Sequence, residues 1–134
     1  MRFRFCCGLS ICVLVLLAVP GSAHHAVQSL FDLEKLSEWK GVLGKVEWIN
    51  PHPYLYLDIK DETGSVKRWA FEADSPATLR RAGFARGAAS FKLGDTYTII
   101  GYPARNGSDT ALAATIQFPD GRRMTLRSGD QSTR

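Results

Sequence analysis

The chain has 134 residues, of which 45% are hydrophobic and 22% are charged, and its formal net charge at pH 7 is +4. This length suits one domain with a modest core that needs no disulfide bonds to fold. The charge gives little support to a nucleic-acid partner, because two of the positive residues, Arg2 and Arg4, belong to a segment that we expect to be removed.

Residues 1–23 have the pattern of a secretory signal peptide. Two arginines are followed by a nearly uninterrupted apolar run over residues 5–19, and the segment ends in Pro-Gly-Ser-Ala. The apolar run is shorter than the roughly 20 residues that a transmembrane helix needs, and small residues precede the expected cleavage point. We therefore expect cleavage after Ala23 and a periplasmic or secreted protein. The alternative is an uncleaved N-terminal anchor.

All three cysteines, Cys6, Cys7 and Cys12, lie inside this predicted signal peptide. The mature chain then has no thiol and no disulfide, which excludes redox chemistry by cysteine. The remaining residues, about 110 of them, predict one domain over residues 24–127. A polar, disordered tail is expected at residues 128–134.

The first half of the mature chain predicts three strands. Residues 26–37 suit a short helix or an irregular arm equally well. From Trp39 to Ile49 polar and apolar residues alternate around two glycines, which predicts a long bent strand. Its expected faces are Val42, Val46 and Trp48 on one side, with Lys45 and Glu47 on the other. Asn50-Pro51-His52-Pro53 forms a stiff loop, and residues 54–60 and 65–72 predict a hairpin.

The second half predicts a helix and the last strands. Ser75, Pro76 and Gly83 are typical of an N-cap, a first helical residue and a helix end. Strands are expected at residues 96–102 and 111–118, followed by a final hairpin to Met124. This order favours an all-β, OB-like barrel of five to six strands, partly open. A β-sandwich is the competing architecture, but a barrel closes the exposed strand edges better.

Four short motifs resemble a family of short exported bacterial proteins of unknown function. They are His24-His25, Phe31-Asp32, Glu47-Trp48-Ile49-Asn50-Pro51-His52 and Gly101-Tyr102-Pro103-Ala104. Where members of that family usually follow the two histidines with Ser-Phe, this chain has Ala26-Val27. The resemblance implies export and an OB-like fold, and it implies no established activity.

The three histidines, His24, His25 and His52, are candidate metal ligands. Cleavage after Ala23 would give His24 a free α-amine beside its ring nitrogen, and a further imidazole would complete a T-shaped set of nitrogens. Such a tetragonal all-nitrogen site favours Cu(II) and resembles the histidine brace of certain copper proteins. His52 is the expected third nitrogen, and His25 could instead chelate through a deprotonated backbone amide. The alternative to a metal site is that His24 and His25 are only part of a polar, mobile terminus and that His52 is a turn residue.

A ligand face is expected around the Asn50–Tyr54 loop, from Trp48, Asn50, Tyr54 and Tyr56. Trp48 alternates in phase with Val46, which also fits a core position, whereas the two tyrosines face away from the apolar side of their strand. The main hypothesis is a binding protein that could hold Cu(II). The alternative is a metal-free module that binds an envelope protein or polymer through this barrel face. A nucleic-acid partner is not expected, and contact with a membrane is expected only during export.

An enzyme is not favoured by the sequence. Asp58, Asp61 and Glu62 crowd one predicted turn without defining an acid–base pair, and a recognisable nucleophile motif or phosphate-binding loop is absent from the sequence. An oxidative copper enzyme would require the histidine site together with an open coordination position.

Overall fold

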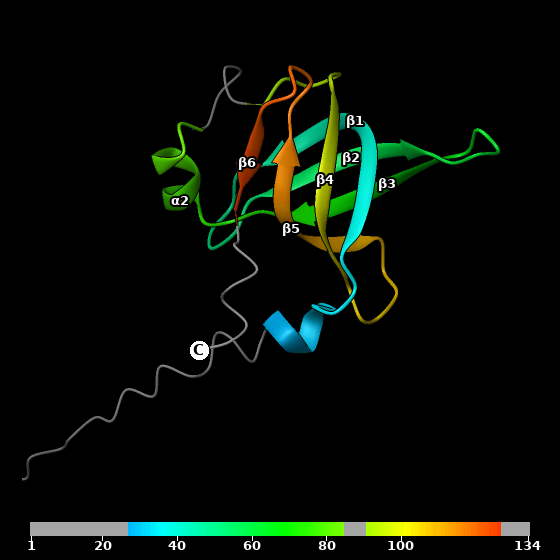
Figure 1. Cartoon of the computed structure of the whole chain (residues 1–134), viewed down its shortest axis with the longest axis horizontal. Helices are drawn as coiled ribbons and strands as arrows, with labels where there is room; N and C mark the ends of the chain where they lie inside the picture. The colour runs from blue at the N-terminus through cyan, green and yellow to red at the C-terminus, as the bar shows by residue number, and fades with distance from the viewer. Residues whose placement is uncertain (1–26, 85–90, 127–134) are drawn as a thin grey trace, which may run out of the picture.

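The computed structural model describes residues 27–84 and 91–126, so the predicted signal peptide (1–23) and tail (128–134) lie outside the described residues. After a single helical turn at residues 27–30, six strands and one short helix follow along the chain (Figure 1). Their bounds are Ser37–Glu47 for β1, Tyr54–Lys60 for β2, Val66–Glu72 for β3, Pro76–Arg81 for α2, Thr96–Pro103 for β4, Thr110–Gln117 for β5 and Arg123–Thr125 for β6.

The strands form a closed barrel with one added edge strand. β1 pairs with both β2 and β4, β2 pairs with β3, and β4 pairs with β5, all antiparallel. The parallel pairing of β3 with residues 110–112 of β5 closes the ring, and β6 pairs antiparallel with residues 115–117 of β5. The predicted all-β, OB-like architecture is confirmed as a mixed, five-stranded closed barrel with an extra strand.

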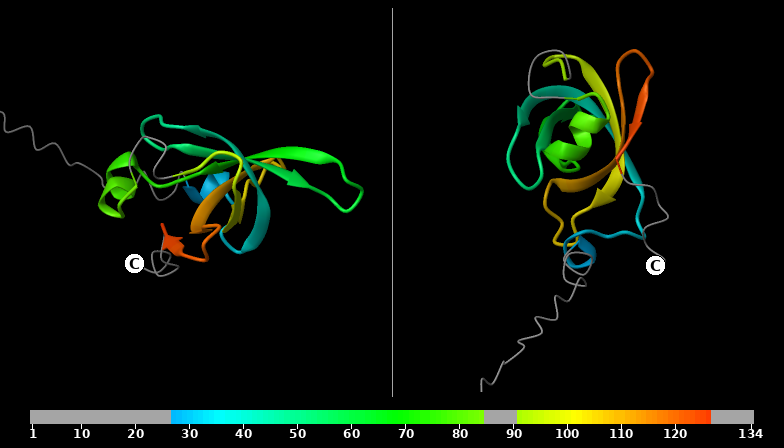
Figure 2. Two further views of the ribbon diagram at one scale, coloured as in Figure 1. Left: turned by 90° about the horizontal axis from the view of Figure 1, so that it is seen from above. Right: turned by 90° about the vertical axis from the view of Figure 1, so that its left-hand side faces the viewer.

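Helix α2 covers one end of this barrel, as the end-on view on the right of Figure 2 shows. The Ser75 side chain accepts a hydrogen bond from the Thr78 amide, and Pro76 occupies the start of the helix, as predicted. Gly83 follows the helix with φ of +89°, a conformation that favours glycine. Leu79 is fully buried and belongs to the barrel core, so a single side chain anchors the helix.

The core fills the barrel from alternate positions of each strand. Leu55 and Leu57 of β2, Phe71 of β3 and Ile99 of β4 are all fully buried, while their neighbours along the strands are more exposed. Within the described residues, the structure contains no helix that is long and apolar enough to cross a membrane.

The predicted faces of β1 are wrong in one respect. Val42 does not share a face with Val46, because the register shifts between Leu43 and Lys45, at Gly44. Such a β-bulge inserts one residue and reverses the alternation beyond it. Leu43 is therefore fully buried, whereas Val42 remains 41% exposed.

Candidate metal and ligand site

The register of the strands places a row of side chains on the outer face of the barrel. Glu47 of β1 lies opposite Tyr54 of β2, and Tyr54 lies opposite Glu72 of β3. Glu72 in turn lies opposite Leu112 of β5. Each of these residues alternates with a core residue on its own strand, so Glu47, Tyr54 and Glu72 lie along the outer face of the barrel, next to Leu112, which is only 1% exposed.

His52 joins this row through a short contact with Glu72. His52 Nδ1 lies 2.7 Å from Glu72 Oε1, and the side chain of Glu72 is only 12% exposed. The Tyr54 hydroxyl donates to the other carboxylate oxygen, Oε2, over 3.1 Å. The carboxylate thus has a partner on each oxygen, which compensates for its burial. Because Nδ1 faces the carboxylate, the neutral ring carries its proton there and its lone pair on Nε2.

The proline-flanked loop holds His52 in position. The Asn50–Pro51 peptide bond is cis, and Pro53 is fully buried. The Ala73 amide donates to the Pro53 carbonyl over 2.8 Å, which ties the loop to the end of β3. Asn50 itself is exposed at the outer side of the loop.

A second carboxylate orders the neighbouring tyrosine. The Tyr56 hydroxyl donates to Glu47 Oε2 over 2.6 Å, and Lys45 Nζ donates to Glu47 Oε1 over 2.9 Å. These hydrogen bonds hold the pKa of Glu47 below its ordinary value. The hydrogen bond to Glu47, followed by partial burial, raises the pKa of Tyr56.

The two tyrosine rings are neighbours on the surface, with centroids 6.4 Å apart and planes tilted by 35°. Burial, followed by the negative charge of Glu72, raises the pKa of Tyr54 to about 12. Both rings are held at their hydroxyl ends by carboxylates and remain partly exposed. Tyr54 and Tyr56 therefore form a fixed, partly exposed aromatic pair.

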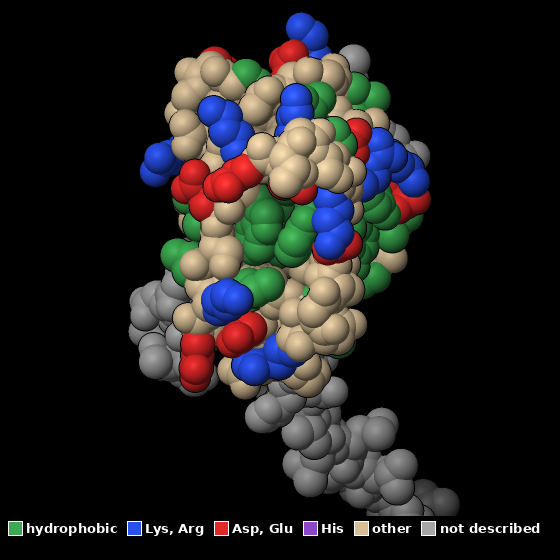
Figure 3. All heavy atoms as spheres, turned by 90° about the vertical axis from the view of Figure 1, so that its right-hand side faces the viewer, with side chains coloured by type: hydrophobic (Ala, Val, Ile, Leu, Met, Phe, Trp, Pro, Cys, Tyr) green, Lys and Arg blue, Asp and Glu red, His purple; other side chains and the backbone are tan. Residues whose placement is uncertain are grey.

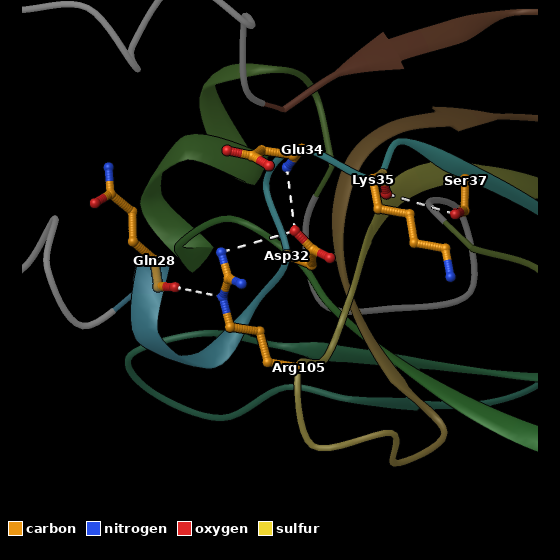
Figure 4. A network of polar contacts seen from close by, with 6 residues as sticks. All are labelled: Gln28, Asp32, Glu34, Lys35, Ser37 and Arg105. Atoms are coloured by element: carbon orange, nitrogen blue, oxygen red, sulfur yellow. Dashed lines mark hydrogen bonds and ion pairs between the residues drawn. The ribbon is translucent and has the colours of Figure 1, made fainter.

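The start of the described chain docks beside β4, close to the same outer face. Phe31 forms a bridge with Ala104, and its side chain is only 4% exposed. Arg105 Nε donates to the Gln28 carbonyl over 2.9 Å, and its guanidinium lies 3.7 Å from Asp32 (Figure 4). The N-terminal turn is therefore fastened to the loop between β4 and β5.

His24 and His25 lie outside the described residues, three and two positions before Val27. Within residues 27–84 and 91–126, no group of three or more His, Cys, Asp or Glu side chains is arranged to hold a metal ion. Of the predicted ligands, only His52 is therefore placed by the structure.

The sequence matches a known protein family over residues 12–114, described as a family of unknown function (DUF6152). The chain belongs to this family. The resemblance to an uncharacterised family is thereby confirmed. The DUF6152 match includes β1 to β4 and most of β5, whereas β6 lies beyond it. No curated protein matches the chain.

The structure divides the predicted ligand face of this DUF6152 protein. Tyr54 and Tyr56 lie on the outer face, whereas Trp48 is partly buried against the core, with its ring centroid 6.3 Å from that of Phe91. Trp48 thus occupies a position facing the core, which its alternation in phase with Val46 also allowed. Trp48 and the two tyrosines therefore do not form one surface.

Sequence reasoning missed the two carboxylates, Glu47 and Glu72. Glu72 is the buried charged residue of the described chain, at 9% exposure, and it contacts His52 from 20 positions away in sequence. The sequence signal that could have identified Glu72 was its position at the end of a predicted strand, on the polar face of that strand. Its pairing with His52 depends on the strand register, which the pattern alone did not provide.

Proposed function

We propose that this protein is an exported, periplasmic binding protein that holds one Cu(II) ion between His24 of its mature N-terminus and His52. One observation carries the proposal: His52 Nδ1 lies 2.7 Å from the buried carboxylate of Glu72. A histidine that binds a metal almost always donates its other ring N–H to a carboxylate, a carbonyl or water. Glu72 supplies that partner, and Tyr54 holds Glu72 in place.

The second ring nitrogen of His52 is the available ligand. No hydrogen bond between Nε2 and another described residue is present, and the side chain is 33% exposed. The ring therefore has one nitrogen held by the protein and one that can meet a metal ion. Neutral imidazole nitrogen is a ligand that suits Cu(II).

The docked N-terminal turn supports a contribution from His24. From Glu72 the outer row continues through Leu112 to Tyr102 of β4, next to the site where the turn docks. Two strand spacings of about 4.8 Å separate Glu72 from β4. Three extended residues span about 10 Å, and in this proposal the three positions before Val27 carry the chain end back toward His52. The α-amine and ring of His24 then complete the nitrogen set, with His25 as the alternative donor.

A metal-free binding function is favoured by a different observation. Tyr54 and Tyr56 form a fixed, partly exposed aromatic pair beside the His52 loop. Paired aromatic rings on the outer face of an OB-like barrel suit a protein or polymer partner. In this second candidate function, the Glu72 contact serves only to fix the loop.

The experiment uses the chain exported with its own N-terminal segment and purified from the periplasm. Its intact mass, measured with and without Cu(II), gives the cleavage site and the stoichiometry together. We expect a chain beginning at His24 that gains one copper ion and shows an axial, nitrogen-type paramagnetic resonance spectrum. His52→Ala and Glu72→Gln should each weaken Cu(II) binding, the latter by about 10- to 100-fold. Glu62→Gln, at the exposed hairpin turn, is the matched control.

A variant with one extra residue before His24 tests the N-terminal amine directly. Its spectrum should lose the signature of amine coordination, because the amine is moved away from the ring of His24. If the spectrum stays the same, the proposed coordination is wrong. If no copper is retained by the intact chain, the metal-free binding function takes its place.

A further inference from the structure

The end of the barrel opposite α2 has a hollow lined with hydrophobic side chains. Figure 3 shows this hollow, with charged side chains of both signs around it. Trp39, Ile59 and Trp69 lie at this end of β1, β2 and β3, and all three are partly buried against the core. Helix α2 covers the other end of the barrel.

Two tryptophans lie side by side at this end of the barrel. The ring centroids of Trp39 and Trp69 are 5.2 Å apart, with planes tilted by 42°. Both rings rest on Phe71 of the core, at 5.4 Å and 6.2 Å. Because Phe71 is fully buried, the two indoles are held in place before any ligand arrives.

The polar edges of the two indoles have no hydrogen-bond partner within residues 27–84 and 91–126. Neither indole N–H of Trp39 and Trp69 donates a hydrogen bond to another residue in the described ranges. An indole has one donor and no acceptor, and a buried tryptophan usually finds a partner for it. This pair therefore offers two hydrogen-bond donors next to two apolar faces.

The β3 cation that shares a face with Trp69 is already paired within the protein. Lys67 Nζ lies 2.7 Å from Asp109 Oδ1, which joins the start of β3 to the loop between β4 and β5. On the outer face of β3, Arg68 forms two hydrogen bonds with Asp58, of 2.7 and 2.8 Å. Since Lys67 is already paired with a carboxylate, a ligand at this end need not carry a phosphate or carboxylate group to balance it.

We propose that this hollow binds an uncharged oligosaccharide, with Trp39 and Trp69 as the contact residues. A pyranose ring has an apolar C–H face that packs on an indole, and hydroxyl oxygens that accept from indole N–H groups. A planar nucleobase fits less well, because rings 5.2 Å apart and tilted by 42° leave no parallel slot between them. The site is separate from the copper site, since Trp69 faces the inside of β3 and Glu72 its outside.

Nuclear magnetic resonance of the indole N–H groups tests the proposal. The chain has three tryptophans, which give three indole signals that single Trp→Phe variants assign. The probes are hexamers of β-1,4-linked N-acetylglucosamine, β-1,4-linked glucose and α-1,4-linked glucose. We expect at least one hexamer to shift the signals of Trp39 and Trp69 while that of Trp48, packed near Phe91, stays in place.

Affinity measurements on conservative variants complete the test. Trp69→Phe keeps an aromatic ring on Phe71 but loses the N–H donor and part of the stacking area, so it should bind the hexamer about tenfold more weakly. Trp48→Phe is the matched control and should bind normally. Thermal unfolding of each variant verifies that the fold is retained.

Two outcomes would overturn the proposal. The first is the absence of any shift of the Trp39 and Trp69 signals with all three hexamers at millimolar concentration. The second is a shift of these signals with protein concentration alone, which would show that a second copy of the chain occupies the hollow. Loss of copper binding in His52→Ala leaves both readouts unaffected, so the two proposals fail independently.

Discussion

Glu72 is the residue on which the polar side of the barrel depends. Its two oxygens meet His52 and Tyr54, and its side chain is nearly removed from solvent. Removing either donor would leave part of a buried carboxylate without a partner, which is costly. The same carboxylate also acts on Tyr54, because a negative charge disfavours a second one nearby.

The first prediction concerns the ionisation of Tyr54. Burial, followed by Glu72, raises its pKa from 10.0 to about 12, so the folded protein binds this proton more tightly than the unfolded chain. The free energy of unfolding should therefore fall as the pH rises from about 10 to about 12. Tyr54→Phe should show a smaller fall over this range, measured by urea unfolding at several pH values.

Glu72→Gln separates the two causes of the raised pKa of Tyr54, which are burial and the charge of Glu72. Because the charge of Glu72 is the second cause after burial, the variant should ionise Tyr54 at a lower pH than the wild type but still above 10.0. Near-ultraviolet absorbance of tyrosinate follows this titration. An unchanged titration curve would show that the carboxylate does not act on the phenol.

At the scale of single elements, two glycines allow the strands to bend. Gly101 lies where the register between β4 and β5 shifts, and a Cβ atom there would collide with the backbone carbonyl of Leu112. Gly44 lies at the bulge of β1, where a Cβ atom would instead meet the side chains of Arg68 and Asp58. The Leu112 backbone next to Gly101 cannot move aside as easily as the ends of the side chains next to Gly44. Replacing the two glycines should therefore differ in its cost in folding free energy.

The second prediction compares Gly101→Ala with Gly44→Ala. Gly101→Ala should lower the free energy of unfolding by about 3 kcal/mol, because the two strands must move apart inside a closed barrel. Gly44→Ala should cost less than about 1 kcal/mol, since Arg68 can move toward solvent. Chemical denaturation of both variants gives the difference, and equal costs would contradict this account.

At the scale of the whole molecule, the N-terminal turn is an addition to a barrel that closes without it. The ring of pairings from β1 to β5 excludes residues 27–30. The turn is attached by the Phe31 bridge to Ala104, by the Arg105 amide, which donates to the Leu30 carbonyl over 2.9 Å, and by the Arg105 side chain. The position of residues 27–31 therefore depends mainly on the loop between β4 and β5.

The third prediction tests this attachment. Arg105→Ala removes the hydrogen bond to the Gln28 carbonyl and the contact with Asp32, which together contribute on the order of 1 kcal/mol. Amide hydrogen exchange at residues 27–31 should become several-fold faster, while exchange at Ile99 in the barrel stays the same. Arg123→Ala, on the exposed side of β6, is the control and should change neither region.

Local sequence patterns determined most of the elements of this fold. The alternation of polar and apolar residues predicted each of β1 to β5 to within two residues of its observed bounds, and Ser75-Pro76 predicted the start of α2. These features depend on local backbone preferences, which neighbouring residues express by themselves. The face of Val42 was wrong because a bulge depends on the partner strand and leaves little trace in a single strand.

Local sequence patterns predicted a proline-flanked loop at His52 beside two outward-facing tyrosines, and they indicated an OB-like barrel. The contacts of Glu72 with His52, of Glu47 with Tyr56 and of Trp39 with Trp69 become visible only in the folded chain. Each of these contacts joins separate strands or a loop to a strand, so it is set by register and barrel closure. Those properties arise from the packing of the whole chain, and a period of two along one strand does not encode them.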